Sequence, residues 1–548
     1  MFKKFKKSQN FSFAISSAKN SIFAACEPTV RLAKKCKSLG KTNRVFQEAQ
    51  LSVLILTLAI FAGSCVKQVE RGIQFAPETL GLTPATAQSD INLNWYADKG
   101  GGVSLARFID ESGKIIQAEG AVIPASGDKS AHKVTVKGLK PDTFYRYSVS
   151  NDGKNWSYEY NFSTPKTTVF RFASIGDPQL TRGGQDSTSN LFSADKTTAS
   201  GWKNTMAKVA AANVNFIAGV GDQVDLTARG DEVEYGHFFA PPELRSIPWA
   251  PAVGNHDRHY LFNYHYNLPN EQKFSKLQGA DYGNASNDEY ADIEAAGNYW
   301  YRYNNALFVV LNTSSYPTSV ASAAPIIKRF DDTLTAAKAA GSGYTWLFVQ
   351  HHKSTASVAD HLADMDIQYY VEAGFEELMT VHKVDFVLAG HDHVYARSFP
   401  LQGKKGGSPS VPDTAQGGAA INKPNGTIYV TITTGSGLKY YDLYNSSGNL
   451  YVKNNENYPY LLNNQKGSAA YAGDNIMNYN TTNNAPAGAI TNSALWTKAI
   501  GILPLSNAVR EQAKKPQYTV VEVEGNTVTF NTYSIDSDRS IDTFTVTK

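Results

Sequence analysis

Several apolar runs in the middle of the chain each stop at a glycine, and a polar residue follows at once. The runs span residues 170–175, 216–220, 247–253 and 385–389, and a fifth at 346–350 ends in two histidines. Continuous apolar runs of this length are typical of buried strands in a parallel sheet, and glycine lets the chain turn off a strand end. The pattern therefore predicts a parallel sheet whose strand ends carry polar side chains.

The polar residues at these ends are carboxylates, one amide and imidazoles. They are Asp177, Asp222, Asn255, His256, Asp257, His351, His352, His391 and His393. Ligands of open α/β sheets bind at the carboxyl ends of the strands, so we expect the five endings to converge. Two solvated loop histidines would explain His391 and His393 alone, but polar strand ends without a shared role do not explain all five motifs.

Helical patterns separate the apolar runs and predict the βαβ alternation of an α/β sandwich. They are clearest at residues 205–212 and 330–340. Beyond the last motif, the pattern predicts a strand at residues 427–434 and a closing antiparallel set at residues 518–523, 527–533 and 543–547. Residues 440–515 between them are rich in Asn, Tyr, Ser and Gly without clear periodicity, which indicates a long surface insertion.

Residues 75–164 show another pattern, with short alternating runs between turn residues. The clearest runs are 91–95, 132–136 and 144–149. Such a stretch of roughly ninety residues predicts a β-sandwich. We therefore expect a leader at 1–65, a β-domain at 66–165 and an α/β domain at 166–548.

Charge separates the leader from the rest of the chain. The first fifty residues hold 11 Lys or Arg against two Glu, and residues 51–65 carry no charge. The whole chain has a formal charge of +3, so residues 66–548 carry a net charge of −6. A mildly acidic body argues against a nucleic-acid partner.

The apolar segment 51–65 ends in small residues and Cys65. It is shorter than the about 20 residues of a membrane-spanning helix, and its end fits a processing site. We expect an exported protein, periplasmic or on the cell surface. The small residues before Cys65 resemble a bacterial lipoprotein signal, which would limit membrane contact to a lipid on Cys65. A single N-terminal membrane anchor is the alternative.

All three cysteines lie in the leader, at Cys26, Cys36 and Cys65. The body after the leader can therefore form no internal disulfide and no thiolate metal site. Any metal must be held by Asp, Asn, His or Gln, and such oxygen and imidazole donors suit Fe, Mn or Zn.

The ordered motifs Gly-Asp, Gly-Asp, Gly-Asn-His-Asp, His and Gly-His-Asp-His resemble those of the calcineurin-like metallophosphoesterase superfamily. The last motif with its continuation to Arg397, and the β-domain in front, are most similar to the purple acid phosphatases. Those proteins carry a fibronectin type III domain before the catalytic unit, and residues 139–147 resemble the corner of such a domain. The resemblance begins near residue 75 and implies a β-domain followed by an α/β sandwich metallophosphoesterase domain.

The resemblance also implies a binuclear metal centre in which Asp222 bridges two ions. The implied ligands are Asp177 and His393 for the first metal, and Asn255, His391 and either His351 or His352 for the second. Counting from Trp346 favours His352 over His351.

Two positions depart from the family pattern. A tyrosine three residues after the bridging aspartate, whose phenolate gives iron-loaded members their purple colour, is replaced by Asp225. A histidine that many other members carry two residues after the first aspartate is replaced by Gln179. Gln179, Asp225 or water therefore remains as the last ligand of the first metal, and the metal pair stays open.

The implied reaction is hydrolysis of small phosphomonoesters by a metal-bound hydroxide. His256 would protonate the leaving alkoxide, with Asp257 orienting or charging its imidazole, although His256 could instead only hydrogen-bond a phosphate oxygen. Arg397 is expected in a structural ion pair. The alternatives are a phosphodiesterase or nucleotidase on the same centre, and a surface binding protein without catalysis.

Overall fold

A computed structural model of the chain describes residues 74–548 with several gaps. The gaps are residues 101, 167, 182–197, 226–231, 258–259, 276–295, 360, 362–363, 405–409, 438–439, 442–449, 453–460, 463–474, 478–505 and 513. The leader with Cys65 and most of the expected insertion at 440–515 lie outside the described residues. Among the residues described, no helix is both long and apolar enough to cross a membrane.

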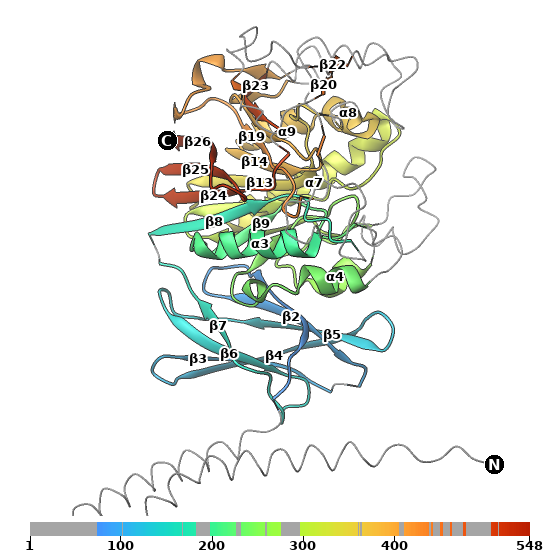
Figure 1. Ribbon diagram of the computed structural model, residues 1–548, viewed down its shortest axis with the longest axis vertical. Coiled ribbons are helices and arrows are strands. Elements are labelled where there is room, and N and C mark those ends of the chain that lie inside the picture. The colour runs from blue at the N-terminus through green and yellow to red at the C-terminus, as the bar shows by residue number, and fades with distance from the viewer. Residues whose placement is uncertain are drawn as a thin grey trace, which may run out of the picture. The chain divides into compact units, whose positions relative to one another are not determined.

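The first part of the described chain is an antiparallel β-sandwich (Figure 1). In spatial order its strands are β1 (Glu78–Pro84), β2 (Ile91–Asp98), β5 (Lys129–Val136), β4 (Ile115–Pro124), β3 (Ser104–Asp110), β6 (Phe144–Ser150) and β7 (Tyr160–Ser163). Strand β4 joins the two halves, because residues 115–120 pair with β3 and residues 121–124 pair with β5. Alternate side chains, among them Trp95 and Phe108, fill one core.

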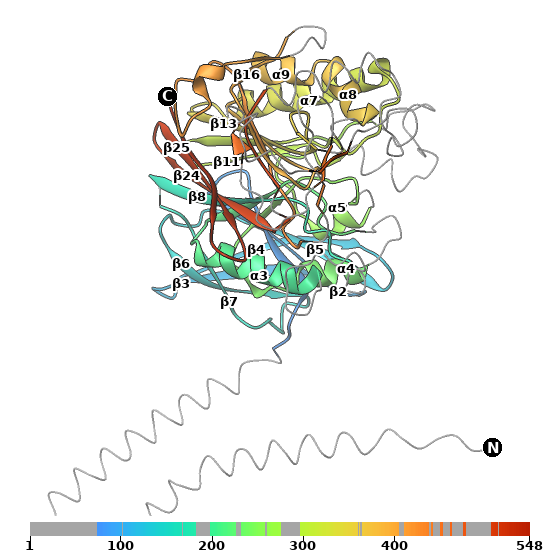
Figure 2. The ribbon, with the colours of Figure 1, turned by 45° about the horizontal axis from the view of Figure 1, so that its top comes forward.

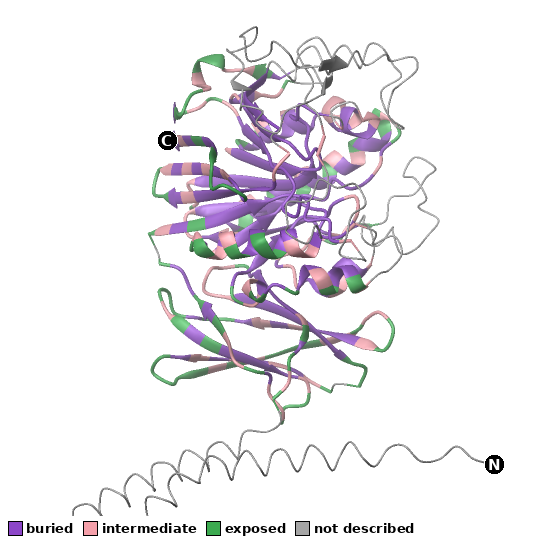
Figure 3. Ribbon diagram, in the orientation of Figure 1, coloured by how far each residue is buried: buried purple, intermediate pink, exposed green. Residues whose placement is uncertain are grey.

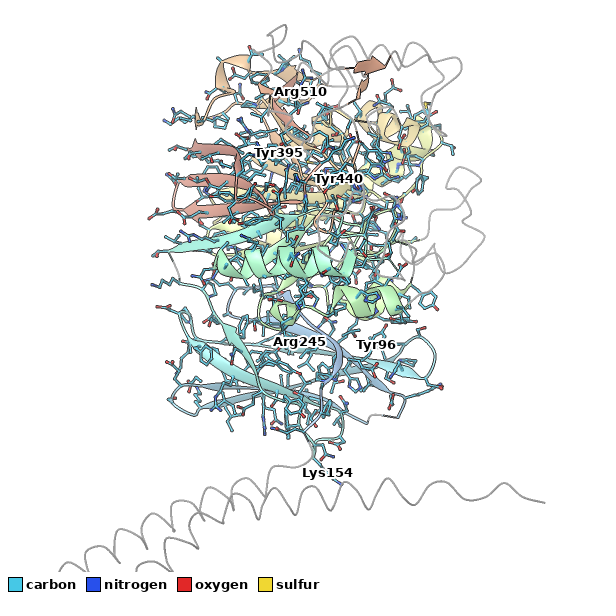
Figure 4. The ribbon with its side chains drawn as sticks, in the orientation of Figure 1. Tyr96, Lys154, Arg245, Tyr395, Tyr440 and Arg510 are labelled. Atoms are coloured by element: carbon cyan, nitrogen blue, oxygen red, sulfur yellow. The ribbon has the colours of Figure 1, made fainter. Side chains whose placement is uncertain are left out.

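Hydrogen bonds tie this sandwich to the second part of the chain. The Tyr147 hydroxyl donates to the backbone oxygen of Arg245 at 2.6 Å, and the Tyr96 hydroxyl donates to Glu232 at 3.0 Å. Tyr96 and Arg245 are labelled in Figure 4. The sandwich thus contacts the segment 232–245, between two of the predicted motifs, and contributes no predicted site residue itself.

The second part contains two β-sheets packed face to face. One has the order β10 (Trp249–Pro251), β9 (Phe216–Gly219), β8 (Val169–Ile175), β24 (Gln517–Glu524), β25 (Thr527–Ser534), β26 (Ser540–Thr547) and β18 (Ala420–Asn422). The other has the order β11 (Tyr299–Tyr303), β12 (Ala306–Val310), β13 (Trp346–Lys353), β14 (Phe386–Gly390), β19 (Ile428–Thr431), β15 (Tyr395–Ser398), β23 (Asn507–Glu511) and β21 (Leu461–Leu462).

Aromatic side chains hold the two sheets together. Phe172 of β8 meets Phe308 of β12 and Phe348 of β13 edge to face, at centroid distances of 5.2 and 5.4 Å. The strands that carry these side chains are among the most buried of the molecule (Figure 3). Strands β8, β9 and β10 are parallel, as are β12, β13, β14 and β19, so the carboxyl ends of each set lie at one edge.

Helices cover both outer faces (Figures 1 and 2). The first sheet packs against α3 (Thr198–Ala211) and α4 (Glu232–Phe238), and the second against α7 (Val320–Ala340), α8 (Met365–Glu372) and α9 (Phe375–His382). The short helix α5 (Leu261–His265) lies against the first group. A β-sandwich followed by an α/β sandwich is the order that the sequence predicts.

Two helices begin earlier than their sequence patterns indicate. Helix α7 begins after a capping box in which Ser319 and Ser322 each bond the other's backbone N–H, and it includes Pro325. Proline disfavours a helix interior, and the helical pattern in the sequence covers only residues 330–340. Helix α3 includes Gly201, where a Cβ would lie 2.0 Å from the backbone oxygen of Ser436. Close packing therefore explains a glycine that helix propensity opposes.

A buried ion pair joins β15 of the second sheet to β26 of the first. The Arg397 guanidinium donates to Asp542 at 2.7 Å and lies over the Phe544 ring at 4.4 Å. The Tyr395 hydroxyl, labelled in Figure 4, donates to the same carboxylate at 2.8 Å. Both charged side chains are almost fully buried. The expected structural role of Arg397 is confirmed.

Replacing Asp542 by Asn should lower the free energy of unfolding by about 3–5 kcal/mol, because the buried Arg397 charge loses its counterion. Urea unfolding of the purified protein measures the change. Lys208 and Asp538 form a matched pair on the surface at 2.7 Å, so Lys208→Gln should cost no more than about 1 kcal/mol. Equal losses for the two variants would contradict a stabilising role for the buried pair.

Candidate metal centre

Four predicted ligands lie just after strand ends, and their backbone adopts the rare positive-φ conformation. The φ angles are +46° at Asp177, +51° at Asp222, +74° at His391 and +48° at His393. Residues with a Cβ seldom adopt positive φ, and each instance costs on the order of 1–3 kcal/mol unless the surroundings impose it. Such conformations cluster at functional sites, and here they occur at predicted ligands from both sheets.

Asp222, directly after β9, contacts side chains or backbone from three other motifs. Its Oδ2 accepts a hydrogen bond from the Gln179 amide at 3.1 Å and lies 3.3 Å from Nε2 of His352. Its Oδ1 accepts from the backbone N–H of His256 at 2.8 Å. The side chain is only 1% exposed. Asp222 therefore lies at the meeting point of the strand ends.

Three predicted ligands gather on one side of Asp222. Nε2 of His352 lies 2.9 Å from Oδ1 of Asn255 and 3.2 Å from Nδ1 of His391. The other ring nitrogen of His352 bonds the backbone oxygen of Val220 at 2.8 Å, which fixes the ring orientation. Ligand atoms of Asp222, His352 and His391 all lie within 4.8 Å of one another, close enough to share one ion.

Asp177 and His393 lie beside the same group. Both Asp177 carboxylate oxygens accept from the backbone N–H of His391 at 3.0 Å. Its Oδ1 lies 3.5 Å from Nε2 of His393 and 3.9 Å from Nδ1 of His352. The predicted ligands of both metals are therefore contiguous and come from β8, β9, β13 and β14 or the loop after β10.

Two glycines of the motifs are required by this close approach. A Cβ at Gly254 would lie 2.0 Å from Oδ1 of Asp222, and one at Gly221 would lie 2.4 Å from Nδ1 of His352. Gly221 also has a φ of +103°. Any side chain at either position would displace a predicted ligand.

The two adjacent histidines of β13 face opposite sides of their strand. The His351 ring lies edge to face on Phe375 of α9 at 4.9 Å, and neither ring nitrogen has a hydrogen-bond partner among the described residues. Burial, together with the neighbouring His352, lowers the pKa of His351 to about 3. The structure brings His352, and not His351, to the other predicted ligands.

Gln179 and Asp225 occupy different parts of the site. The Gln179 side chain is fully buried, and its Oε1 has no hydrogen-bond partner among the described residues while its Nε2 donates to Asp222. Oδ1 of Asp225 lies 3.4 Å from Nδ1 of His256 instead. The geometry therefore favours Gln179 over Asp225 as a further oxygen ligand of the first metal.

The expected contact between Asp257 and the His256 imidazole is not what the structure shows. The Asp257 carboxylate accepts from the backbone N–H groups of Gln223 and Gly254, both at 2.9 Å. The His256 ring bonds Asp225 instead, with Nδ1 2.5 Å from its backbone oxygen. Asp257 and His256 are neighbours in sequence, and the turn directs their side chains apart. Asp257 joins the loops after β9 and β10, and Asp225 orients the imidazole.

The donor set suits a metal pair. Burial raises the pKa of Asp222, but the neighbouring imidazoles of His352 and His256 outweigh burial and hold it below its usual range. Burial and the nearby His361 lower the pKa of His391 well below its usual value, so the imidazole stays neutral. Ionised carboxylates and neutral imidazoles are the ligand forms that Fe, Mn and Zn bind. Oε1 of Gln179, buried and without a hydrogen-bond partner among the described residues, is a further oxygen that could bind a metal.

Three residues near the site were not predicted from the sequence. His361 and Asp364 follow β13, and the His361 ring stacks on His391 at 4.0 Å. The Tyr441 ring lies edge to face on His361 at 4.7 Å and on His393 at 5.2 Å. None of the three follows a strand end with a glycine, so the pattern that identifies the other residues does not mark them.

Comparison with known proteins agrees with this fold. Residues 77–164 match the model of the purple acid phosphatase N-terminal domain, and residues 170–395 match that of the calcineurin-like phosphoesterases. Purple acid phosphatase PPD1 from yellow lupin (Lupinus luteus) seeds has a similar fold, with a TM-score of 0.54 at 15% identity over 86% of this chain and 74% of that one.

Sequence relatives include two proteins described as uncharacterized, MT2654 and Rv2577, from two strains of Mycobacterium tuberculosis. Each is 23% identical to this chain over 411 residues, which cover 68% of this chain and 72% of the relative. Calcineurin-like and purple acid phosphatase families use a binuclear metal centre, for which this chain presents the donors described above. The chain therefore carries a purple acid phosphatase N-terminal domain followed by a calcineurin-like phosphoesterase domain, and this pair of domains supports a purple acid phosphatase-like metallophosphoesterase.

Proposed function

We propose that the protein is a phosphatase that hydrolyses small phosphomonoesters at a binuclear metal centre. The observation that carries this proposal is the environment of Asp222. One buried carboxylate contacts Gln179, the backbone of His256 and the ring of His352, which come from three different strand ends. A carboxylate with both oxygens at such a junction is suited to bridge two cations.

The proposed ligands divide around this bridge. Asp177, His393 and Gln179 would hold the first metal with Asp222, and Asn255, His352 and His391 would hold the second with it. A bound metal pair of this kind polarises phosphate oxygens and lowers the pKa of water toward neutrality.

His256 is the proposed general acid. Its side chain is 25% exposed, so a bound ester can reach it, and its Nε2 lies 3.9 Å from Oδ2 of Asp222. Its Nδ1 is engaged by the backbone oxygen and carboxylate of Asp225. Nε2 is thus the atom that can give a proton to the leaving alkoxide, while Asp225 holds the ring in position.

Assays of p-nitrophenyl phosphate and its diester, each with and without chelator, test this function. Chelator-sensitive hydrolysis of the monoester is expected. Faster hydrolysis of the diester or of a nucleotide would favour the phosphodiesterase or nucleotidase alternative. No hydrolysis by metal-loaded protein would favour a surface binding protein.

We also propose that the leader exports the protein, with a lipid on Cys65, because segment 51–65 is apolar and ends in small residues. Fractionation of cells that express the full chain or Cys65→Ser tests this, and unchanged membrane association of the variant would exclude the lipid. For the N-terminal domain we propose a fibronectin type III-like identity, supported by the strand order and by the Tyr145 hydroxyl, which accepts from the backbone of Lys140 at 2.8 Å.

Asp222→Asn should abolish hydrolysis and reduce bound metal, because a neutral amide cannot bridge two cations as a carboxylate does. Elemental analysis beside the monoester assay measures both effects. Asp225→Asn is the matched control, and it should keep its metal and lose only turnover, because Asp225 faces His256. Full metal content in Asp222→Asn would exclude the bridge, and metal loss in Asp225→Asn would make Asp225 a ligand.

His256→Ala should keep its metal and lose on the order of 10² to 10⁴ in kcat, the range for a lost general acid. The loss should be smaller for nitrophenyl phosphate than for an alkyl phosphate, because nitrophenolate leaves without a proton. Kinetics on a series of leaving groups measure this dependence. Equal losses along the series would show that His256 binds phosphate instead.

Iron-loaded protein should lack a purple absorption band, because Asp225 replaces the tyrosine whose phenolate colours the family. A visible spectrum with elemental analysis of the same sample tests this. Among the described residues, Tyr441 has a phenol ring in contact with His393, so a purple band that disappears in Tyr441→Phe would show that Tyr441 reaches the first metal. That result would replace Gln179 in the proposed ligand set.

A further inference from the structure

His391 presents its two ring nitrogens to different surroundings. Nδ1 faces the proposed ligands, 3.2 Å from Nε2 of His352. Nε2 lies on the opposite edge of the ring, is buried, and has no hydrogen-bond partner among the described residues. Oδ2 of Asp364 lies 3.9 Å from this Nε2 atom.

The chemistry of a neutral imidazole connects these two edges. An imidazole that gives the lone pair of Nδ1 to a cation carries its single proton on Nε2. A buried N–H needs an acceptor, and metal-binding histidines usually find one in a carboxylate or a backbone oxygen. Asp364 is the carboxylate in place to accept it.

The side chain of Asp364 is directed to the histidines rather than to its own helix. Asp364 occupies the N-cap position of α8, where an aspartate commonly bonds the first backbone N–H groups, but it makes no such bond. Its Oδ2 lies 2.7 Å from Nδ1 of His361 instead. The His361 ring is stacked on His391 at an interplanar angle of 23°. His361 therefore holds the carboxylate beside the edge of His391.

The loop that carries this pair is fixed to the motif of His391. The backbone N–H of His361 donates to Oδ1 of Asp392 at 2.8 Å. The other oxygen of Asp392 accepts from the Ser357 hydroxyl and from the backbone N–H of Ala359. The residue next to His391 thus anchors the loop, so Asp364 and His391 keep their relative positions.

We infer that Asp364 is a positioning residue that fixes His391 with its proton on Nε2 and its Nδ1 directed at the second metal, with His361 holding the carboxylate. This inference rests on the proposed function, because it takes His391 as a ligand of that metal. Ligand atoms of His361, Asp364 and His391 lie within 4.8 Å of one another, so a separate cation site is the competing explanation. Such a site would require an unprotonated Nε2.

The test compares metal binding by full-length Asp364→Ala, Asp364→Asn and wild type in a competition with a chromophoric zinc chelator. Loss of an outer carboxylate typically weakens metal binding by about 10- to 100-fold. We expect Asp364→Ala to bind the second zinc ion more weakly by that factor and to bind the first zinc ion with unchanged affinity. Asp364→Asn should bind the second zinc ion more tightly than Asp364→Ala does, because its amide oxygen still accepts a hydrogen bond. Helix α8 should persist, because the carboxylate does not cap it.

Asp331→Ala is the matched control. Asp331 accepts from a different histidine, His382, at 2.8 Å, where it joins α7 to α9, and its loss should leave both zinc affinities unchanged. Unchanged zinc affinity in Asp364→Ala would overturn the inference. A third ion in wild type that is lost in Asp364→Ala would establish the separate cation site instead.

A measurement on wild type removes any dependence on variant folding. In zinc-loaded protein with ¹⁵N-labelled histidine, the ring of His391 should carry its proton on Nε2, and an unprotonated Nε2 would overturn the inference. Failure of the proposed function has a different result, because His391→Ala would then keep both zinc ions. The two failures are therefore separable.

Discussion

Two carboxylates, Asp177 and Asp222, are buried beside several imidazoles, and hydrogen bonds from the surrounding backbone stabilise their charges. A buried charge without partners costs several kcal/mol. Backbone N–H groups of His256 and His391 donate to the two carboxylates, and both N–H groups come from turns that follow other strands. The positive φ angles at the strand ends are the conformational cost of directing side chains and N–H groups to one place.

The same constraint links the site to the core. Asp177 and Asp222 follow strands of the first sheet, whereas His352 and His391 belong to β13 and the end of β14 in the second. The distance between these two groups is set by the packing of Phe172 on Phe308 and Phe348 between the sheets. A change in core volume there would move the two halves of the site relative to each other.

The features predicted correctly from the sequence are those with a local physical origin. An apolar run followed by Gly-Asp or Gly-Asn-His specifies a strand, a turn and a donor within a few residues. The alternation of a strand places His351 and His352 on opposite faces, but both faces of β13 are buried, so alternation alone does not say which one faces the site. Asp257 shows a related limit, since the direction of a side chain after a turn depends on dihedral angles that residue types do not specify.

Contacts between distant segments could not be predicted in this way. His361, Asp364 and Tyr441 reach the site through loops, and their positions depend on bonds such as that from His361 to Asp392. The sequence around them contains neither a glycine turn nor a periodic pattern of apolar residues. The order of the strands was also beyond local reasoning, because nothing in residues 517–547 indicates that β24 pairs with β8.

That pairing has a consequence for how the molecule is made. Strand β8, whose end carries Asp177, lies between β9 and β24, and its residue Ser174 pairs with Thr519. Ser174 is translated long before Thr519, so the edge of β8 that pairs with β24 has no partner while the residues between them are synthesised. Contacts so distant in sequence slow folding, and an unpaired strand edge invites association with other chains. The sheet that carries two of the carboxylates can therefore be completed only after residues 517–547 have been translated.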